Sequence, residues 1–469
     1  MAGYLWHRGA EWRESWDYWF KWTDEHLTFD KLRPLIYTYD ELGAQALDRL
    51  DEISPLTKAP APSENDRTPP EKAPEKPHRD LYALLRDNAD SDEVLGKLWA
   101  EVNAIPPWVD WAQIERGQKV FVRYAGPAIF ALTFQSLVGG FGSRRVVETL
   151  ARTGGFGVKV TRRRLLETFQ HILQVTRDLA SVQPGGDGFA SSIRVRLLHA
   201  AVRRRILALA AEKPSYYDVQ EWGIPVNDLD SIGTISTFSA TLIWIGLPRQ
   251  GIHLTTQEKE DYVALWRWVA HILGTPTDVF ESVSPTNVLS GLSNQPPSYV
   301  SREFLAAETY WLNGAKLARE LGVKRPPFYY SLLVLGQCIF FMVLCYCHRL
   351  FPQWGEARNK KVQQALFSLT IHNPALGALG KETKFEFQYI PTLDMISTAA
   401  AAAGTATVAP GSSHFNSHGP RRTERRNLVA LVLASLFVAL LSWLGVRTAS
   451  ALFGTAAGMA PSAAATVAW

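Results

Sequence analysis

The feature that most constrains this sequence is an uncharged, mostly apolar run near its end, "NLVALVLASLFVALLSWLGV", at residues 427–446. At the rise of an α-helix, a run of this length extends about 30 Å, the thickness of the hydrocarbon core of a bilayer. A buried core helix explains the run less well, because the tail over 447–469 offers little for it to pack against. We therefore expect a transmembrane helix over 427–446.

The charges beside this run predict how it is oriented. Arginines 421, 422, 425 and 426 precede it and only Arg447 follows it closely. Because positive charge is retained on the cytosolic side, we expect the residues before the run to lie in the cytosol. The sequence thus predicts a single-pass, tail-anchored protein. The endoplasmic reticulum is the expected membrane, since it is the usual destination of such an anchor.

The remainder of the chain predicts an all-α fold. Hydrophobic residues make up 46% of the 469 positions, which is enough for a sizeable core. From Leu81 to about Ile390, apolar residues recur at spacings of three and four, and no series of alternating strands interrupts them. The formal net charge of +4 is mild and its charges are interleaved, so we expect no nucleic-acid partner.

Changes in composition divide the chain into segments. A second apolar run, at 328–347, is long enough to span a membrane, but Ser331 and Gln337 lie within it. We favour a helix buried in the fold or lying against the bilayer over a second span. The predicted segments are a Trp-rich arm (1–54) that packs on the body or on a membrane surface, a Pro-rich disordered linker or insertion (55–80), the main helical domain (81–396), a low-complexity tether (397–426), the membrane helix (427–446) and a short tail (447–469).

One histidine lies within a basic helical stretch, "IRVRLLHAAVRRRI", at 193–206. His199 shares a helix face with Val195, Val202 and Ile206, and this face is expected to point inward because arginines occupy the others. A buried imidazole needs partners for both ring nitrogens. His199 is therefore either a hydrogen-bonded core residue or a ligand of a metal or haem iron. Arg196 and Arg203, one turn away on either side, form a solvated face or reach an acidic group.

A second helix is predicted at 161–176, "TRRRLLETFQHILQVT". Arg164, Thr168 and His171 form a polar stripe on it. This stripe either holds a bound oxygen species or substrate, or hydrogen-bonds a neighbouring loop. The apolar stripe beside it comprises Leu165, Phe169, Ile172 and Leu173, and the side expected to face solvent carries Glu167, Gln170 and Gln174.

These two motifs, in this order, resemble the rubber oxygenases, or latex-clearing proteins. "RRRLLET" is followed about thirty residues later by "RVRLLHAAVR". The segments at 105–121, 222–247 and 264–274 agree as well, so the resemblance extends over about 100–350. The nearest type within the family is the fungal oxygenase bound to the endoplasmic reticulum, which cleaves a farnesyl chain in mycophenolic acid biosynthesis.

The resemblance implies roles for several residues. His199 would be the proximal ligand of a b-type haem in a globin-like helical body, with Arg164 and Thr168 close to the haem pocket. Before that threonine the family can carry a lysine that reaches the iron, but this chain has Glu167. Glu148 is the candidate base, or else a surface residue. His171 is a distal group or a rival ligand, and His271 is a core or pocket residue.

The expected function is that of a haem-dependent oxygenase. The resemblance implies that O2 cleaves a carbon–carbon double bond of an isoprenoid chain. A cytosol-facing, anchored enzyme suits a prenylated small molecule or a membrane lipid better than an extracellular polymer. Two alternatives remain open: a haem-binding sensor or carrier without turnover, and a membrane-anchored structural protein in which His199 is merely a core residue.

Overall fold

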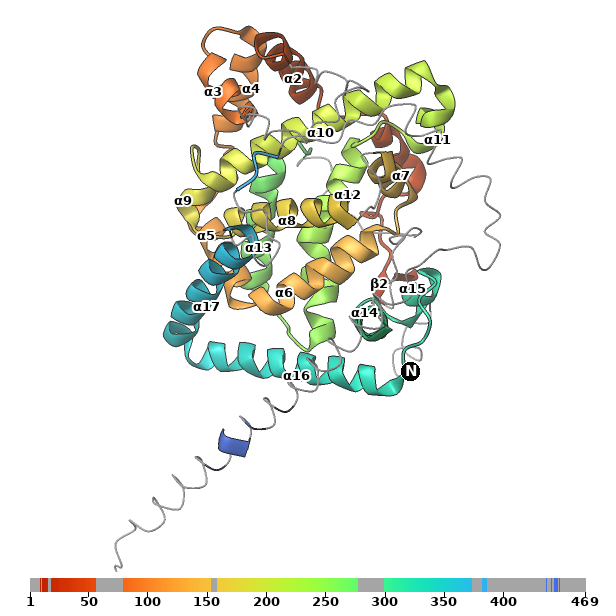
Figure 1. The fold of residues 1–469 in the computed structure, drawn as a ribbon, viewed down its shortest axis with the longest axis vertical. Helices are drawn as coiled ribbons and strands as arrows, with labels where there is room; N and C mark the ends of the chain where they lie inside the picture. The colour runs from red at the N-terminus through yellow and green to blue at the C-terminus, as the bar shows by residue number, and fades with distance from the viewer. Residues whose placement is uncertain are drawn as a thin grey trace, which may run out of the picture. The chain divides into compact units, whose positions relative to one another are not determined.

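Helices form nearly all the regular structure in the computed structural model of this chain (Figure 1). The structure describes residues 9, 11–15, 18–55, 79–152, 158–276, 299–372, 382–385, 436, 440, 443–445 and 447. The chain divides into two units, residues 1–295 with 306–407, and residues 296–305 with 408–469. Among the described residues the only sheet is one antiparallel hairpin near the N-terminus. The predicted all-α class is therefore confirmed in the sense that the protein is mostly helical.

The N-terminal part joins the hairpin to a helix of the main core. Ala46, Leu47 and Leu50 of this helix, α2, are buried in the same hydrophobic cluster as the helices that follow. The predicted division into segments stays a prediction, and residues 56–78 and 386–435 lie outside the described residues. The elements are β1 (Trp12–Ser15), β2 (Tyr18–Lys21), α1 (Phe29–Leu32), η2 (Arg33–Ile36), α2 (Glu41–Ile53), α3 (Leu81–Asn88) and α4 (Glu93–Asn103).

The remaining elements build the body around α10, the longest helix in the described part of the chain. They are α5 (Trp111–Arg123), α6 (Ala125–Ala131), η3 (Leu132–Val138), α7 (Arg144–Arg152), α8 (Val158–Val175), α9 (Leu179–Val182), α10 (Asp187–Glu212), η4 (Pro214–Tyr216), α11 (Val219–Trp222), α12 (Asp228–Phe238), η5 (Leu242–Gly246), η6 (Pro248–Gln250), α13 (Thr256–Ile272), α14 (Tyr299–Leu312), α15 (Ala315–Glu320), α16 (Phe328–Leu350), α17 (Pro352–Phe367) and η7 (Ser368–His372).

Helix α10 is buried on most sides, including the side that carries its arginines. Arg194 donates two hydrogen bonds to Asp80, at 2.8 and 2.7 Å. Arg204 lies partly exposed in ion pairs with Asp48 and Asp51 of α2. Acidic side chains on α2, and Asp80 just before α3, therefore cover the arginine faces of this helix. They also neutralise the charge of the guanidinium groups.

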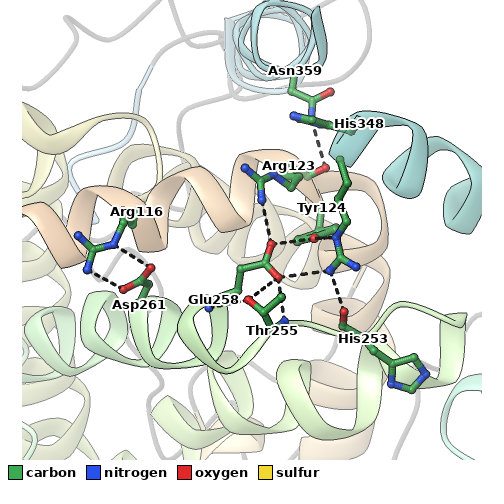
Figure 2. Close-up of polar contacts among 10 residues, drawn as sticks. Arg116, Arg123, Tyr124, His253, Thr255, Glu258, Asp261, His348 and Asn359 are labelled. Atoms are coloured by element: carbon green, nitrogen blue, oxygen red, sulfur yellow. Dashed lines mark hydrogen bonds and ion pairs between the residues drawn. The ribbon is translucent and has the colours of Figure 1, made fainter. Parts of the chain in front are cut away.

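Helices α5 and α13 approach each other closely. Gly117 makes this possible, since a β-carbon at that position would lie 2.2 Å from the backbone oxygen of Asp261. Next to this contact, Arg116 donates two hydrogen bonds to the carboxylate of Asp261, each of 3.0 Å (Figure 2). Close backbone packing and a two-point ion pair thus fix this helix pair in one register.

Glu258 anchors a second polar network at the same helix pair (Figure 2). Its side chain accepts hydrogen bonds from Arg123 and from the hydroxyl of Tyr124, both at 2.9 Å, and closes a capping box with Thr255. Arg349 at the end of α16 donates to the same tyrosine hydroxyl at 2.9 Å. This network ties α16 to the body through α5 and α13.

Helix α16 is the second apolar run of the sequence. It lies along the edge of the body with α17 turning back from its end (Figure 1). Tyr330, Val334 and Cys338 form part of a buried stripe. Elsewhere the helix exposes large apolar side chains, namely Phe328, Tyr329, Leu332, Ile339, Phe340, Val343, Tyr346 and Leu350. By length and composition, α16 and the segment 228–250 could each cross a membrane, which is weak evidence on its own.

Candidate functional site

His199 lies on a partly covered turn of α10. Val195, Leu198 and His199 are partly accessible, whereas Leu197 and Ala200 on the other side are buried. Within the described part of the chain, the His199 ring makes no hydrogen bond. Burial lowers its pKa from 6.5 to about 4, and Arg203 adds to this shift while Asp40 opposes it. The imidazole is therefore neutral near pH 7.

His171 of α8 faces the same region from the neighbouring helix, which packs on α10. Only 7% of its surface is exposed. Its Nδ1 lies 2.9 Å from the hydroxyl of Ser191, whereas its Nε2 is buried and has no hydrogen-bond partner. Burial lowers the pKa of His171 from 6.5 to about 4, and the nearby His199 contributes to the shift. A second neutral imidazole therefore lies beside the first.

This arrangement suits a haem better than a free metal ion. The described residues contain no group of three or more His, Cys, Asp or Glu side chains that could hold an ion. A b-type haem needs only one or two axial ligands from the protein, and a neutral imidazole supplies the required lone pair. The unpartnered nitrogen of His171 and the partly accessible ring of His199 both meet this need. The residues present thus fit the group.

Arg164 lies on α8 and Glu148 on α7, and a hydrogen bond joins these two helices. The Arg164 guanidinium donates to the backbone oxygen of Leu150, two residues beyond Glu148, at 3.4 Å. Burial lowers the pKa of Arg164, and Glu167 opposes that shift. Glu148 forms ion pairs with Arg144 and Arg152 of its own helix, which surround it with positive charge. Its role as a base stays a prediction.

The orientation of α8 differs from the one the sequence predicted. Gln170 and Gln174 were expected to face solvent, but they are 1% and 3% exposed. Leu165, expected on the buried stripe, is 42% exposed, and Thr168 is exposed as well. A segment far along the chain, residues 382–385, explains the difference because it covers the glutamine side of the helix. We call this segment the strap.

The strap is hydrogen-bonded to α8 at several positions. The backbone of Thr383 donates to the Gln170 side chain at 2.9 Å and accepts from it at 3.2 Å. The Thr383 hydroxyl donates to Glu167 at 3.0 Å, and Arg163 pairs with the same carboxylate at 2.9 Å. Glu167 therefore holds the strap in this chain, and its carboxylate is engaged there.

Arg196 and Arg203 are buried, contrary to the predicted solvated face. Arg196 is 2% exposed and donates to Asp40 through two hydrogen bonds of 2.7 Å and to Glu101 at 2.8 Å. Arg203 donates to the backbone oxygens of Pro225 and Val226 at 3.2 and 2.9 Å. Both guanidinium groups are engaged in structural contacts that join α10 to its neighbours. They are poor candidates for binding the acidic groups of a haem.

His271 lies apart from the histidine pair, on α13. Its ring stacks on Trp268 with centroids 5.6 Å apart and meets the edge of Trp108 at 6.0 Å. Aromatic packing of this kind is typical of a core residue.

Two contributors to the site escaped the sequence analysis. Ser191 holds His171, and its position gave a usable signal, because Ser191, Val195 and His199 recur at four-residue spacing on one helix face. The strap gave no such signal. Phe385 contacts the His171 ring edge-on at 6.3 Å across more than two hundred residues of sequence, and no local pattern encodes that contact.

The fold and the site together define a mostly helical protein whose centre is a pair of neutral imidazoles on packed helices. Residues 122–287, which carry this pair, match the model of the family described as "ER-bound oxygenase mpaB/B'/Rubber oxygenase, catalytic domain". The resemblance seen in the motifs is thereby confirmed, and the family is one of oxygenases.

Individual relatives are distant. The rubber oxygenase of Streptomyces sp. (strain K30) is 22% identical over 287 residues, which are 53% of this chain and 67% of that protein. A solved structure, latex clearing protein LCP in the closed state, has 17% sequence identity and a TM-score of 0.48, and the match covers 71% of this chain and 91% of that one.

Proposed function

We propose that this chain is a membrane-anchored, haem b-dependent oxygenase that cleaves a carbon–carbon double bond of an isoprenoid or prenylated molecule. The observation that carries the proposal is the pair of neutral imidazoles, His171 and His199, within the segment that matches an oxygenase catalytic domain. The proposed reaction breaks one C=C bond and places both atoms of O2 in two carbonyl groups. Its atoms and electrons therefore balance without a further reductant.

The bound haem would supply the iron that activates O2. His199 would hold it as a neutral axial ligand, because burial keeps the ring unprotonated near pH 7. Arg164 places a partly buried positive charge where α8 meets α7, and Thr168 offers a hydroxyl one turn further along. We propose that this positive charge and this hydroxyl stabilise developing negative charge on oxygen.

The surroundings of His199 suit a hydrocarbon substrate. The next turn of α10 contributes Val202 and Ile206 to an apolar cluster with Tyr216 and Tyr217, against which Leu198 packs. On α8, Leu165 is exposed beside Arg164. Apolar side chains flanking a few polar groups are typical of a site that takes a hydrophobic ligand. We therefore propose a prenylated small molecule or a membrane lipid as substrate.

Two features support a membrane as the setting, proposed to be the endoplasmic reticulum with the body in the cytosol. The uncharged run at 427–446 is long enough to span, and its described residues Leu436, Leu440, Trp443 and Leu444 are helical and exposed. In the main unit, α16 exposes an apolar face while its other side packs on the body. A helix of that kind lies in the plane of a bilayer surface.

Lipid-borne quenchers test the role of α16. A fluorophore attached at Phe340→Cys is compared with one at Glu52→Cys, which lies on α2 at the opposite end of the body (Figure 1), both in a Cys347→Ser background of the full chain in vesicles. We expect nitroxide lipids to quench the label at 340 much more strongly. Equal quenching at the two positions would show that α16 does not face the bilayer.

Isotope labelling tests the proposed activity. The full chain, loaded with haem during expression, is incubated in vesicles with a farnesylated aromatic compound or squalene under ¹⁸O2. We expect two carbonyl products, each carrying one ¹⁸O atom, and a large loss of product in Arg164→Ala. Haem-loaded protein that consumes no O2 and forms no carbonyl from either substrate would overturn the oxygenase proposal.

A second candidate is a haem-binding sensor or carrier without turnover. The favouring observation is Glu167, where the family can carry a lysine, because here the carboxylate binds the strap and Arg163. The sensor or carrier hypothesis predicts haem binding but no product in the same isotope experiment. One assay therefore distinguishes it from the oxygenase.

A further inference from the structure

A cavity of about 460 Å³ lies between the N-terminal elements and helices α7 and α11, and neither histidine of the pair lines it. Its volume is in the range of small-molecule sites, about 300–1,000 Å³. We propose that this cavity binds a small organic anion, in which a phosphate or carboxylate group is attached to an aromatic or apolar body. The inference goes beyond the oxygenase activity and requires no bound haem. Most of the lining is charged or aromatic, namely Phe29, Arg33, Arg144, Arg145, Glu221 and Trp222.

Positive charge exceeds negative charge in the walls of this cavity. The guanidinium groups of Arg33, Arg144 and Arg145 line it together with a single carboxylate, that of Glu221. Arg145 is neutralised by Asp230, to which it donates a hydrogen bond of 2.8 Å. Arg33 makes no hydrogen bond or ion pair in the part of the chain that the structure describes. Its charge is therefore available to an anion.

Arg144 is held in place while its N–H groups stay available. Its guanidinium lies over the ring of Trp222, 4.2 Å from the centroid. Its ion-pair partners Glu148 and Glu221 are 3.8 and 4.0 Å away. These distances exceed the roughly 2.7–3.2 Å of an N–H···O hydrogen bond, so neither carboxylate uses the donors of Arg144. A planar guanidinium binds a phosphate or carboxylate through two parallel hydrogen bonds.

Aromatic side chains beside the arginines suit the rest of the ligand. Phe29 lines the cavity and is 60% exposed. Trp222 lines it as well, and it packs against the cluster that contains Tyr216 and Tyr217, which fixes its position. An inorganic ion would satisfy the charges but would leave Phe29 exposed. An anion with an aromatic or apolar body covers both kinds of surface.

Contacts outside the cavity hold two of its walls together. The hydroxyl of Tyr37, directly after η2, donates to the backbone oxygen of Gln220 in α11 at 2.9 Å. The backbone of Ile224 donates to the oxygen of Ile36 at 2.8 Å. Between these contacts, Gly223 has a φ of 74°, and a β-carbon there would lie 2.5 Å from the same Ile36 oxygen. These walls are therefore fixed before a ligand binds, which lowers the entropy cost of binding.

The position of the cavity favours a ligand from solution. Helices α7 and α11 lie at the upper right of the body, whereas α16 runs along its lower edge (Figure 1). Because α16 is the helix proposed to face the bilayer, the cavity lies away from the proposed membrane surface. A lipid phosphate has the same chemistry but is held at that surface. The choice between the two sources rests on the proposed membrane setting, whereas the binding of an anion does not.

Calorimetric titration with 1-naphthyl phosphate tests the proposal. The full chain is reconstituted in phosphatidylcholine nanodiscs, and empty nanodiscs provide the blank. Arg33→Gln and Arg144→Gln each remove one guanidinium from an exposed side chain, so both variants should fold. Arg86→Gln, 52% exposed on α3, is the matched control. We expect saturable binding to the parent and the control, binding weaker by roughly tenfold or more in each cavity variant, and weaker binding of inorganic phosphate to the parent.

No saturable binding to the parent, or equal affinities in the parent and both cavity variants, would overturn the site. Dioleoyl phosphatidic acid added to the same nanodiscs, with salt to screen long-range repulsion, separates the two sources. We expect the affinity for 1-naphthyl phosphate to stay the same. Its loss in those nanodiscs would assign the cavity to a lipid phosphate and overturn the soluble ligand. Since these titrations need no haem, their failure is distinguishable from failure of the proposed oxygenase.

Discussion

The ion pair between Asp40 and Arg196 allows the most quantitative prediction. Arg196 is 2% exposed and donates two hydrogen bonds of 2.7 Å to Asp40 and a third of 2.8 Å to Glu101. We consider Asp40→Asn, which keeps an oxygen to cap α2 at Gly43 but removes the charge and one of the two oxygens that accept from Arg196. Breaking a buried pair by removing one partner costs about 3–5 kcal/mol. Because Glu101 remains, we expect a loss near the lower end, about 3 kcal/mol.

Thermal unfolding of the full chain in detergent measures this loss. At roughly 2 °C per kcal/mol for a large domain, the midpoint should fall by about 6 °C. The matched control is Asp48→Asn, on the same helix, whose pair with Arg204 is 58% exposed at the aspartate and 41% at the arginine. An exposed pair contributes less than about 1 kcal/mol, so the control should shift the midpoint little. Equal shifts in the two variants would refute the reasoning that burial sets the cost.

Further predictions concern packing and pH. Gly117→Ala should lower the free energy of unfolding by about 1–3 kcal/mol, and the thermal midpoint with it, because its methyl group would meet the backbone oxygen of Asp261. Gly140→Ala should leave the midpoint nearly unchanged, because a β-carbon there has no atom within 4 Å. Burial raises the pKa of Glu308 from 4.5 to about 7, so its contribution is fully present below pH 4.5 and is lost as the pH rises to about 7. Glu308→Gln should therefore be more stable than the parent at about pH 8, by up to about 3 kcal/mol, and similar at about pH 4.5. Midpoints of parent and variant at the two pH values check this, and a constant difference would contradict it.

Local patterns in the sequence predicted the helical class and the two motifs of the site. Apolar spacings of three and four depend only on neighbouring residues, and His199 was found because an imidazole stands out on an apolar helix face. The family resemblance added the expected ligand role, and residues 122–287 match that family.

Contacts between distant segments could not be predicted in the same way. The burial of Gln170 and Gln174 depends on the strap, which lies more than two hundred residues further along the chain. Likewise, the arginines of α10 were expected in solvent because a charged residue usually lies there. Their burial follows from Asp40 and Asp80, acidic residues that the fold brings to α10 from well before it in the sequence.

We propose that His199 binds the iron of a haem. The most direct test is the absorption spectrum of the full chain, expressed with ample haem and purified in detergent, beside that of His199→Ala. We expect a Soret band in the parent that is lost or shifted in the variant. A parent without a Soret band, or a variant with the same spectrum as the parent, would contradict it.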